Sequence, residues 1–489
     1  MIKVGTGIAS LQFDDGHGLF GYGPLGGRGL NVPHDSKESD TLQVRVLYLV
    51  RDTQKLLIVS LDLTSGSRVV QAELRDALAE AGHHFAPEEV LVVGTHTHSG
   101  PGGYHGNFYD YFGQYPSFRG AEVKREIVAK ALHASLNALS NTVPCKVGVA
   151  HRAVWGPGRN RSLRAFLTNF EGDLTRWNAE LESAGIAGLP PATTTPEQRA
   201  IDPRLTVVAF VAADGRTVAT WATWCCHAAT FRRAPERPYH RDWPGVAVDL
   251  VERSKEAGFA IVHQRSNGDV TAIPSGDISV PEPVDRARAI GAAIAEQWLE
   301  ALGAAVAKAT PEAAFEVHFH DFAPKESGLP TFEIGEPVLV GSEEYDPPGI
   351  VTRSFLGESR TLSFRKGAQG VKFPALGPLQ WALRVLPALK PSPKHPMWLL
   401  RLDDHLFFAS PFEQTTYAAR TVEKALVAKW KKARGGSVTA SPVGLVGDYA
   451  GYLTTPSEYA NQNYEGAHTL YGPTQLETMI GKWAGLIKE

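Results

Sequence analysis

The stretch KLLIVSLDL at residues 55–63 is a nearly continuous apolar run of strand length. Apolar residues at helical spacing follow at 67–81, and a second apolar run, VLVVG, occupies 90–94. Such runs predict strands buried on both faces, and the 3.6-residue period predicts an amphipathic helix. Because another helical pattern follows at 123–139, the order strand, helix, strand, helix indicates an α/β fold whose sheet is at least partly parallel.

Outward from this unit, the same patterns predict a mixed parallel and antiparallel sheet flanked by helices. Strands are expected at residues 145–150, 205–212, 218–227, 260–262, 315–319, 398–402 and 406–409. Helices are expected at residues 244–257, 284–302 and 415–432.

The remaining segments suggest one catalytic domain, 1–489, that carries two insertions. Residues 188–203 are rich in Pro and Thr, and residues 342–396 are rich in Pro and Gly. The second insertion contains an apolar patch at 373–389, for which the roles of lid and membrane contact both stay open. Residues 444–471 are dense in Tyr and Gly and are expected to pack as an irregular segment over a site or core.

Composition excludes several classes of protein. The 489 residues carry 49 Lys and Arg against 52 Asp and Glu, so no global basic field is present to bind nucleic acid. Three cysteines are too few for a disulfide framework. The first residues lack the pattern of a signal peptide, and no run approaches about 18 apolar residues, so a cytoplasmic protein is expected.

The segment GTHTHSGPGG at residues 94–103 directly follows a predicted strand. In an extended chain, His96 and His98 would project from the same face. In open α/β sheets, ligands gather beyond the carboxyl ends of the strands. The pair therefore indicates a metal or substrate site, with two histidines bonded to the backbone of a Gly-rich turn as the alternative.

Further candidates lie at the ends of other predicted elements. His227 ends the apolar run WATWCCH, where both a ligand role and a structural role are open. Cys226 is interpreted as a small buried hydrophobic residue rather than as a thiolate ligand or nucleophile. Carboxylates follow at Asp242, Asp269 and Glu413. Spacing alone favours Glu413 as a first-turn acid that interacts with a helix dipole.

These segments resemble the catalytic domain of the neutral (alkaline, non-lysosomal) ceramidases, which are zinc-dependent amidases that split the N-acyl bond of the sphingolipid ceramide. The resemblance extends from about residue 5 to residue 473, and its segments occur in the family's order. They are Gly21-Tyr22-Gly23, Leu61-Asp62, GTHTHSGPGGY at 94–104, Asn160-Arg161-Ser162, the His227 segment, Gly268-Asp269-Val270-Thr271, Pro411-x-Glu413-x-Thr415-Thr416, Tyr449-Ala450-Gly451-Tyr452, Tyr464-Glu465-Gly466 and Tyr471-Gly472-Pro473.

The resemblance implies a set of metal ligands and a set of catalytic residues. The implied zinc ligands are His96, His227, Glu413 and Tyr452. The implied groups around the scissile carbonyl are His98, Arg161 and Tyr464, with Thr271 near the substrate. Zinc lowers the pKa of bound water toward about 7, so zinc-bound water would attack the amide. His98 would carry the proton to the leaving amine, and Arg161 and Tyr464 would stabilise the oxyanion.

The sequence also departs from the family's pattern. Thr271 stands where the ceramidases have Ser after Gly-Asp-Val, and the immunoglobulin-like module and secretory leader of the family are not seen. We therefore expect hydrolysis of a linear N-acyl amide, from ceramide or another small-molecule or lipid N-acyl amine. The alternatives are a metal-independent hydrolase with Cys226 or Thr271 as nucleophile, and a non-catalytic relative that binds a ligand.

Overall fold

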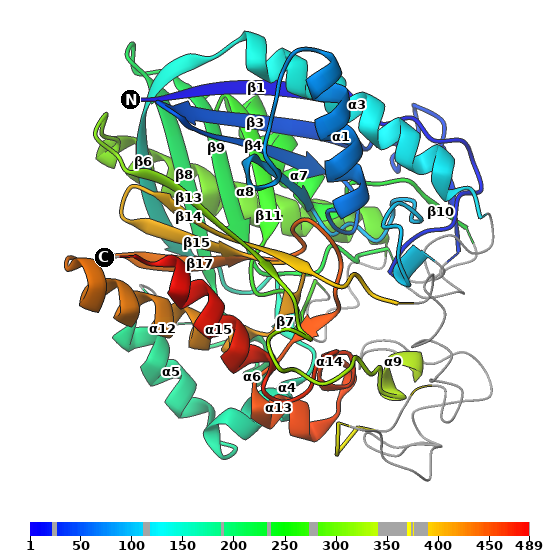
Figure 1. Cartoon of the computed structure of the whole chain (residues 1–489), viewed down its shortest axis with the longest axis vertical. Helices are drawn as coiled ribbons and strands as arrows, with labels where there is room; N and C mark the ends of the chain where they lie inside the picture. The colour runs from blue at the N-terminus through cyan, green and yellow to red at the C-terminus, as the bar shows by residue number, and fades with distance from the viewer. Residues whose placement is uncertain are drawn as a thin grey trace.

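The structure is a computed structural model that describes residues 1–21, 27–110, 118–186, 190–231, 236–272, 282–340, 369–372, 375 and 390–488, with the backbone alone at 339 and 340. The main elements form four layers: helices, a large sheet, a small sheet and helices again (Figure 1). This arrangement confirms the predicted α/β class.

The large sheet has eight strands in the order β11-β9-β8-β6-β1-β3-β4-β5. The two outermost pairs, β4 with β5 and β9 with β11, are parallel, and the pairs between them are antiparallel. The bounds are β1 (Ile2–Ser10), β3 (Gln43–Arg51), β4 (Gln54–Leu61), β5 (Val90–Gly94), β6 (Val143–Ala153), β8 (Arg204–Ala212), β9 (Thr217–Trp224) and β11 (Phe259–Gln264). The mixed sheet expected from the sequence is therefore confirmed.

The small sheet packs face to face on the large one through an apolar core to which both sheets contribute. Its strands are β13 (Phe315–Phe322), β14 (His395–Leu402), β15 (His405–Ala409) and β17 (Thr439–Val443). Trp221 of β9 stacks on Phe407 of β15 with ring centroids 4.4 Å apart. Burial of such aromatic side chains stabilises the sandwich by roughly 1.5–3 kcal/mol for each fully buried apolar side chain.

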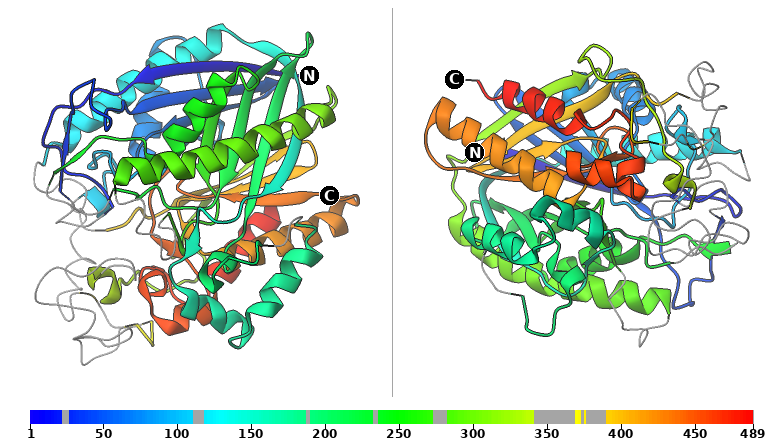
Figure 2. Two further views of the ribbon diagram at one scale, coloured as in Figure 1. Left: turned by 180° about the vertical axis from the view of Figure 1, so that it is seen from behind. Right: turned by 90° about the horizontal axis from the view of Figure 1, so that it is seen from below.

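Helices cover the outer face of each sheet (Figure 2). The helices on the large sheet are α1 (Arg68–Glu80), α3 (Gly120–Ser140), α7 (Asp242–Arg253) and α8 (Pro283–Lys308). The helices on the small sheet are α12 (Thr416–Arg434) and α15 (Gln475–Leu486). Each buries an apolar face against its sheet, which explains why the helical patterns were readable from the sequence.

Short elements fill the loops at the ends of the strands. They are β2 (Arg28–Leu30), η2 (Pro87–Glu89), β7 (Arg159–Asn160), α4 (Leu163–Leu167), η3 (Thr168–Phe170), α5 (Leu174–Ser183), α6 (Pro196–Arg199), β10 (Glu236–Pro238), β12 (Val270–Thr271), α9 (Pro337–Val340), β16 (Glu413–Gln414), β18 (Tyr452–Leu453), α13 (Pro456–Asn461) and α14 (Tyr464–Ala467). The last three lie in the segment expected to be irregular, and they do pack over the core and the strand ends.

Some boundaries differ from those predicted. The strand expected at 218–227 ends at Trp224, so His227 lies in the loop that follows it. In the segment 188–203, residues Ala200 and Ile201 are fully buried beside the short helix α6. The apolar patch at 373–389 lies outside the described residues except for Ala375, so its role stays a prediction.

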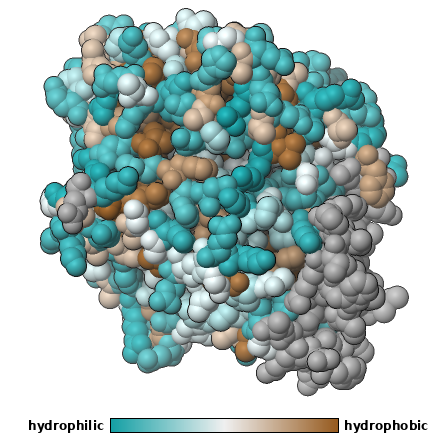
Figure 3. All heavy atoms as spheres, viewed as in Figure 1, coloured by the Kyte–Doolittle hydropathy of each residue, from teal (hydrophilic) through white to brown (hydrophobic). Residues whose placement is uncertain are grey.

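The surface seen in Figure 3 is largely hydrophilic, and its apolar residues form separate groups. Among the described residues, no helix combines the length and apolar character that crossing a bilayer requires.

Close packing of α3 on β1 depends on glycine. A Cβ at Gly7 would lie 2.0 Å from the carbonyl oxygen of Ala134 on α3. In contrast, a Cβ at Gly303, on the exposed side of α8, would meet nothing within 4 Å.

We expect Gly7→Ala to lower the free energy of unfolding by about 1–3 kcal/mol, the usual cost of overpacking. The matched variant Gly303→Ala should instead raise it, by up to about 1 kcal/mol, because it restricts the unfolded chain without a clash. Denaturant titration of both variants measures the difference. Equal stability of Gly7→Ala and the unmodified protein would show that α3 does not approach β1 this closely.

Candidate metal centre

The candidate site lies where strands of both sheets end. His96 and His98 follow β5 and His227 follows β9 in the large sheet, whereas Glu413 follows β15 in the small sheet. The parallel bridge between Thr97 and Ala228 holds the first two loops together. Four polar side chains from distant segments therefore meet at one edge of the sandwich.

Three histidines converge in this site. The ligand atoms of His96, His98 and His227 all lie within 4.8 Å of one another, and the three side chains are at least 90% buried. The backbone at His96 has φ of +73°, so the segment is not extended as the sequence argument assumed. A left-handed turn at a non-glycine residue costs about 1–3 kcal/mol, and such strain is concentrated at functional sites.

Backbone carbonyls set the tautomers of two of these rings. His96 Nδ1 donates to the oxygen of Thr64 at 2.8 Å, and His227 Nδ1 donates to the oxygen of Val270 at 2.9 Å. Because a carbonyl only accepts, each neutral ring carries its proton on Nδ1 and an unshared pair on Nε2. Burial lowers the pKa of His227 to about 4, so its ring is neutral at pH 7.

Glu413 faces these unshared pairs. Its Oε2 lies 3.3 Å from His96 Nε2 and 2.9 Å from His227 Nε2. A carboxylate oxygen among imidazole nitrogens is a donor set that suits a divalent metal such as zinc. The residues present therefore fit a metal ion.

Two neighbours orient the carboxylate of Glu413. Tyr449 donates from its hydroxyl to Oε1 at 2.7 Å, and Asn267 donates from Nδ2 to Oε2 at 3.2 Å. Hydrogen bonds of this kind fix the ligands of a metal and tune its affinity. Neither residue was predicted to act in the site, although Tyr449 lies in one of the quoted segments.

Tyr452 reaches the site by strand pairing. It is the Cα partner of Glu413 in the short parallel pair of β16 and β18, so the two side chains project to the same side. Its hydroxyl accepts a hydrogen bond from Arg161 Nη2 at 3.0 Å. Burial, followed by the charge of Glu413, raises the pKa of Tyr452 well above its usual value. The phenol therefore keeps its proton at neutral pH.

Arg161 and Tyr464 lie beside Tyr452. The ring centroids of Tyr452 and Tyr464 are 5.5 Å apart, and the Arg161 guanidinium lies 5.4 Å from the centre of the Tyr464 ring. Glu465 holds Arg161 in place by accepting from Nε at 2.9 Å. Burial raises the pKa of Tyr464 to about 12, so its hydroxyl keeps its proton at neutral pH and can donate.

Asp269 ties together the segments that carry these residues. Its Oδ1 accepts from the backbone and hydroxyl of Thr416 at 2.8 Å, and its Oδ2 accepts from Asn160 at 2.7 Å. Its carbonyl oxygen accepts from the backbone N–H of Arg161 at 2.8 Å. Asp269 therefore links strand β7, which directly precedes Arg161, to the start of α12, close to Glu413.

The other candidates have different surroundings. Thr271 lies on β12, directly after the residue whose carbonyl holds His227, and it is 1% exposed. Asp242 accepts from the backbone and hydroxyl of Thr230 at 2.9 and 2.7 Å, so it stabilises a loop. Cys226 is fully buried in the apolar core between the large sheet and α7 and α8, as its interpretation as a hydrophobic residue predicts.

Structural comparison places this fold among known proteins. A crystal structure of neutral ceramidase from Pseudomonas aeruginosa superposes with a TM-score of 0.74 at 20% sequence identity, covering 99% of this chain and 74% of that one. A structure described as ceramidase complexed with C2 gives a TM-score of 0.76. The four-layer architecture is therefore the fold of these enzymes.

Sequence comparison identifies the family to which the chain belongs. The family model for neutral/alkaline non-lysosomal ceramidase, N-terminal, matches residues 40–279 and 385–481. Neutral ceramidase of Mycobacterium tuberculosis is 25% identical over 97% of this chain and 75% of its own length. Neutral ceramidase of P. aeruginosa is 26% identical over 80% of this chain and 57% of its own length. The chain belongs to the neutral/alkaline non-lysosomal ceramidase family, as its resemblance predicted.

Zinc is expected to raise the melting temperature of chelator-treated protein. A ligand that binds only the folded state stabilises it by about 2.7 kcal/mol at a hundred times its Kd. His227→Ala should abolish the shift, whereas His83→Ala, which alters an exposed histidine, should retain it. Thermal denaturation with and without zinc measures the effect, and an undiminished shift in His227→Ala would contradict the site.

Tyr449→Phe is expected to weaken zinc binding by about 10–100-fold, because Glu413 loses the hydroxyl that orients it. The matched control is Tyr459→Phe, which removes a buried hydroxyl bonded to Gln369 instead. Competition with a chromophoric chelator measures both affinities. If Tyr449→Phe binds zinc as tightly as Tyr459→Phe does, Tyr449 has no part in positioning the ligand.

Proposed function

We propose that this protein is a zinc-dependent amidohydrolase that cleaves the N-acyl bond of ceramide or of a related N-acyl amine. The observation that carries the proposal is the meeting of Glu413 Oε2 with the Nε2 atoms of His96 and His227 at 3.3 and 2.9 Å. Membership of the ceramidase family supports the reaction class, since neutral ceramidases are hydrolases of this amide bond.

In this proposal His96, His227, Glu413 and Tyr452 hold the ion. A bound zinc ion supplies Lewis acidity, which acidifies water and polarises a carbonyl. Glu413 and Tyr452 are partners in the pair of β16 and β18, which follow strands of the small sheet. The two histidines lie in the loops after β5 and β9 of the large sheet.

His98 is the proposed carrier of the proton. Its Nε2 lies 3.3 Å from His96 Nε2, so the ring faces the same space as the metal ligands. An imidazole in this position can accept a proton from the attacking water and deliver it to the departing amine. Gly21 packs directly on this ring, since a Cβ there would lie 2.3 Å from His98 Nδ1. This contact limits how far the ring can turn.

Arg161 and Tyr464 are the proposed stabilisers of negative charge on the amide oxygen. The guanidinium is held by Glu465 and by the carbonyl of Gly268, to which Nη2 donates at 2.7 Å. Donors held rigidly before the reaction stabilise a developing oxyanion without the cost of reorganising solvent. Thr271 is proposed to contact the substrate, where its extra methyl group would select among amine groups.

The function is tested by release of free amine from a short-chain ceramide and from N-acyl amino acids. We expect hydrolysis that is lost after exhaustive chelation and restored by zinc. Because no cysteine takes part in this proposal, a thiol reagent should have no effect. Activity that survives chelation but is lost with the thiol reagent would contradict the proposal and favour Cys226 as a nucleophile. Absence of both zinc and activity would favour a binding protein.

His98→Ala should lower kcat by about a hundredfold to ten-thousandfold while the zinc content stays at one equivalent, because His98 moves protons. His227→Ala should lose both activity and zinc. Metal analysis and kinetics on the same preparations separate the two roles. Loss of zinc from His98→Ala would instead make His98 a third imidazole ligand.

A further inference from the structure

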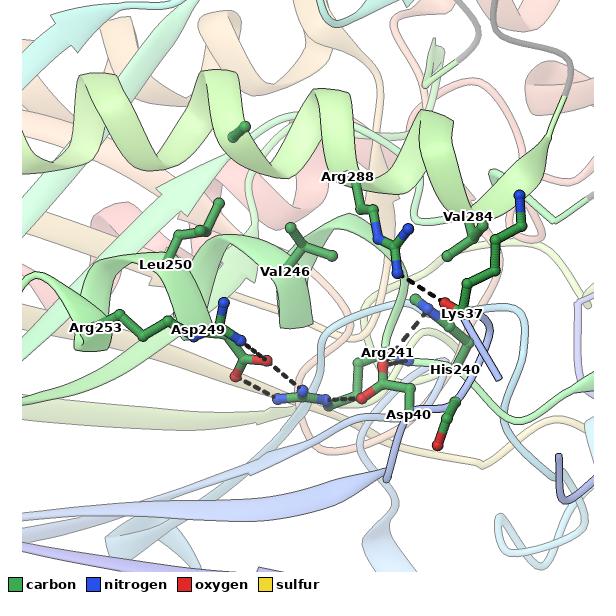
Figure 4. Close-up of a pocket in the computed structure, with 12 residues that line it drawn as sticks. Lys37, Asp40, His240, Arg241, Val246, Asp249, Leu250, Arg253, Val284 and Arg288 are labelled. Carbon is green, nitrogen blue, oxygen red and sulfur yellow. Dashed lines mark hydrogen bonds and ion pairs between the residues drawn. The ribbon is translucent and has the colours of Figure 1, made fainter. Parts of the chain in front are cut away.

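A cavity lies apart from the candidate metal centre. It has a volume of about 430 Å³ and opens between residues 37–40 and helices α7 and α8 (Figure 4). None of the proposed metal ligands lines it. Small-molecule pockets span roughly 300–1,000 Å³, so this cavity is large enough for a ligand of its own.

The carboxylates of the pocket are already hydrogen-bonded to a buried arginine. Arg241, which is buried, donates from Nε to Asp40 at 2.8 Å and from Nη1 and Nη2 to Asp249 at 3.0 and 2.7 Å. Two-point pairing of a guanidinium with a carboxylate is among the strongest arrangements of side chains. Asp40 and Asp249 are therefore committed to Arg241, and they repel an incoming anion less than free carboxylates would.

Two cations at one end of the pocket form only long, exposed ion pairs. Lys37 and Arg288 share one carboxylate, Asp285, at 3.5 and 3.4 Å, and their side chains are 54% and 51% exposed. Exposed ion pairs of this kind contribute about 0–1 kcal/mol, so an incoming anion can displace Asp285 at little cost. Arg288 also donates from Nη2 to the backbone oxygen of Lys37 at 2.8 Å, which the dashed line in Figure 4 marks.

His240 adds a hydrogen-bond donor at the same end. Its Nδ1 accepts the backbone N–H of Asp242 at 2.8 Å, so the neutral ring carries its proton on Nε2. The backbone of His240 also bonds the loop of the metal centre: its N–H donates to Ser99 at 3.2 Å, and its oxygen accepts from Thr97 at 2.6 Å. The pocket thus adjoins the segment that carries His98.

The other wall of the pocket is apolar. Val246 and Leu250 on α7 and Val284 on α8 line the space between the two helices. A ligand that fills the pocket therefore needs an anionic group for the end at Lys37 and Arg288, and an apolar part that lies along α7.

We propose that this pocket binds a phosphate monoester with an apolar substituent, from either a free metabolite or a lipid headgroup. A phosphate carries about −1.5 to −2 charges at pH 7 and three acceptor oxygens, which match the ammonium, guanidinium and imidazole donors at this end. The substituent packs on Val246 and Leu250. This site is independent of the amidase activity proposed above.

Calorimetric titration with hexyl phosphate tests the proposal. The unmodified protein should bind hexyl phosphate more tightly than inorganic phosphate and should not bind hexanol. Arg288→Glu and Lys37→Glu should each weaken binding of hexyl phosphate at least tenfold. The matched control Arg216→Glu, which reverses an exposed arginine in a distant turn, should leave it unchanged. Leu250→Glu should weaken binding of hexyl phosphate more than binding of inorganic phosphate.

The outcomes separate clearly. No binding of hexyl phosphate, or equal affinity in Arg288→Glu and the unmodified protein, would overturn the proposal. If Arg288→Glu does not fold, Lys37→Glu gives the same test at another exposed side chain. Sedimentation with phosphatidylcholine vesicles, with and without phosphatidic acid, distinguishes the sources. Pelleting that requires both phosphatidic acid and Arg288 supports a lipid headgroup, and hexyl phosphate binding without pelleting supports a free ester.

Discussion

The central constraint in this structure is the approach of a buried carboxylate to two imidazole nitrogens whose unshared electron pairs point at it. The carbonyls of Thr64 and Val270 take the Nδ1 protons of His96 and His227, so the Nε2 atoms have no proton to offer Glu413. Electron pairs facing one another in a dry site repel unless a cation lies between them. The arrangement of these side chains therefore suits a positive ion. Much of the surrounding structure holds the side chains in place.

That support comes from both layers of the sandwich. Asp269 fastens strand β7, directly before Arg161, to the start of α12, and Glu465 fixes the guanidinium itself. Tyr449 and Asn267 orient Glu413. Since the two sheets share an apolar core, a shift of one sheet against the other would disturb the core and the donors together. A rigid core therefore also keeps the donor groups of the site in place.

The sequence predicted the parts of the molecule that have local signals. Long apolar runs and amphipathic helices located β4, α1 and β5, and their order predicted the partly parallel sheet. The two histidines after β5 also have a local signal, because they directly follow a predicted strand. It is the left-handed backbone at His96, and not an extended chain, that brings them together. The prediction that the two histidines lie close together is confirmed, whereas the extended backbone assumed for it is wrong.

Other parts of the site have no local signal. By spacing alone, Glu413 looked like an acid at the start of a helix, and only the family resemblance pointed to a ligand. The strands β16 and β18 have two residues each, too few for any periodic pattern. The roles of Tyr449, Asp269 and Glu465 depend on hydrogen bonds to distant segments. Such contacts are fixed by tertiary packing, which single-sequence patterns do not encode.

The separation of His96 and Tyr452 along the chain bears on how the protein is made. The segment of His96 leaves the ribosome well before Glu413 and Tyr452 do. Contacts between such distant segments form only after the intervening loops have closed. Until then the histidines are without their carboxylate partner. Any ion that needs all of these donors therefore binds only after the distant segments have come together.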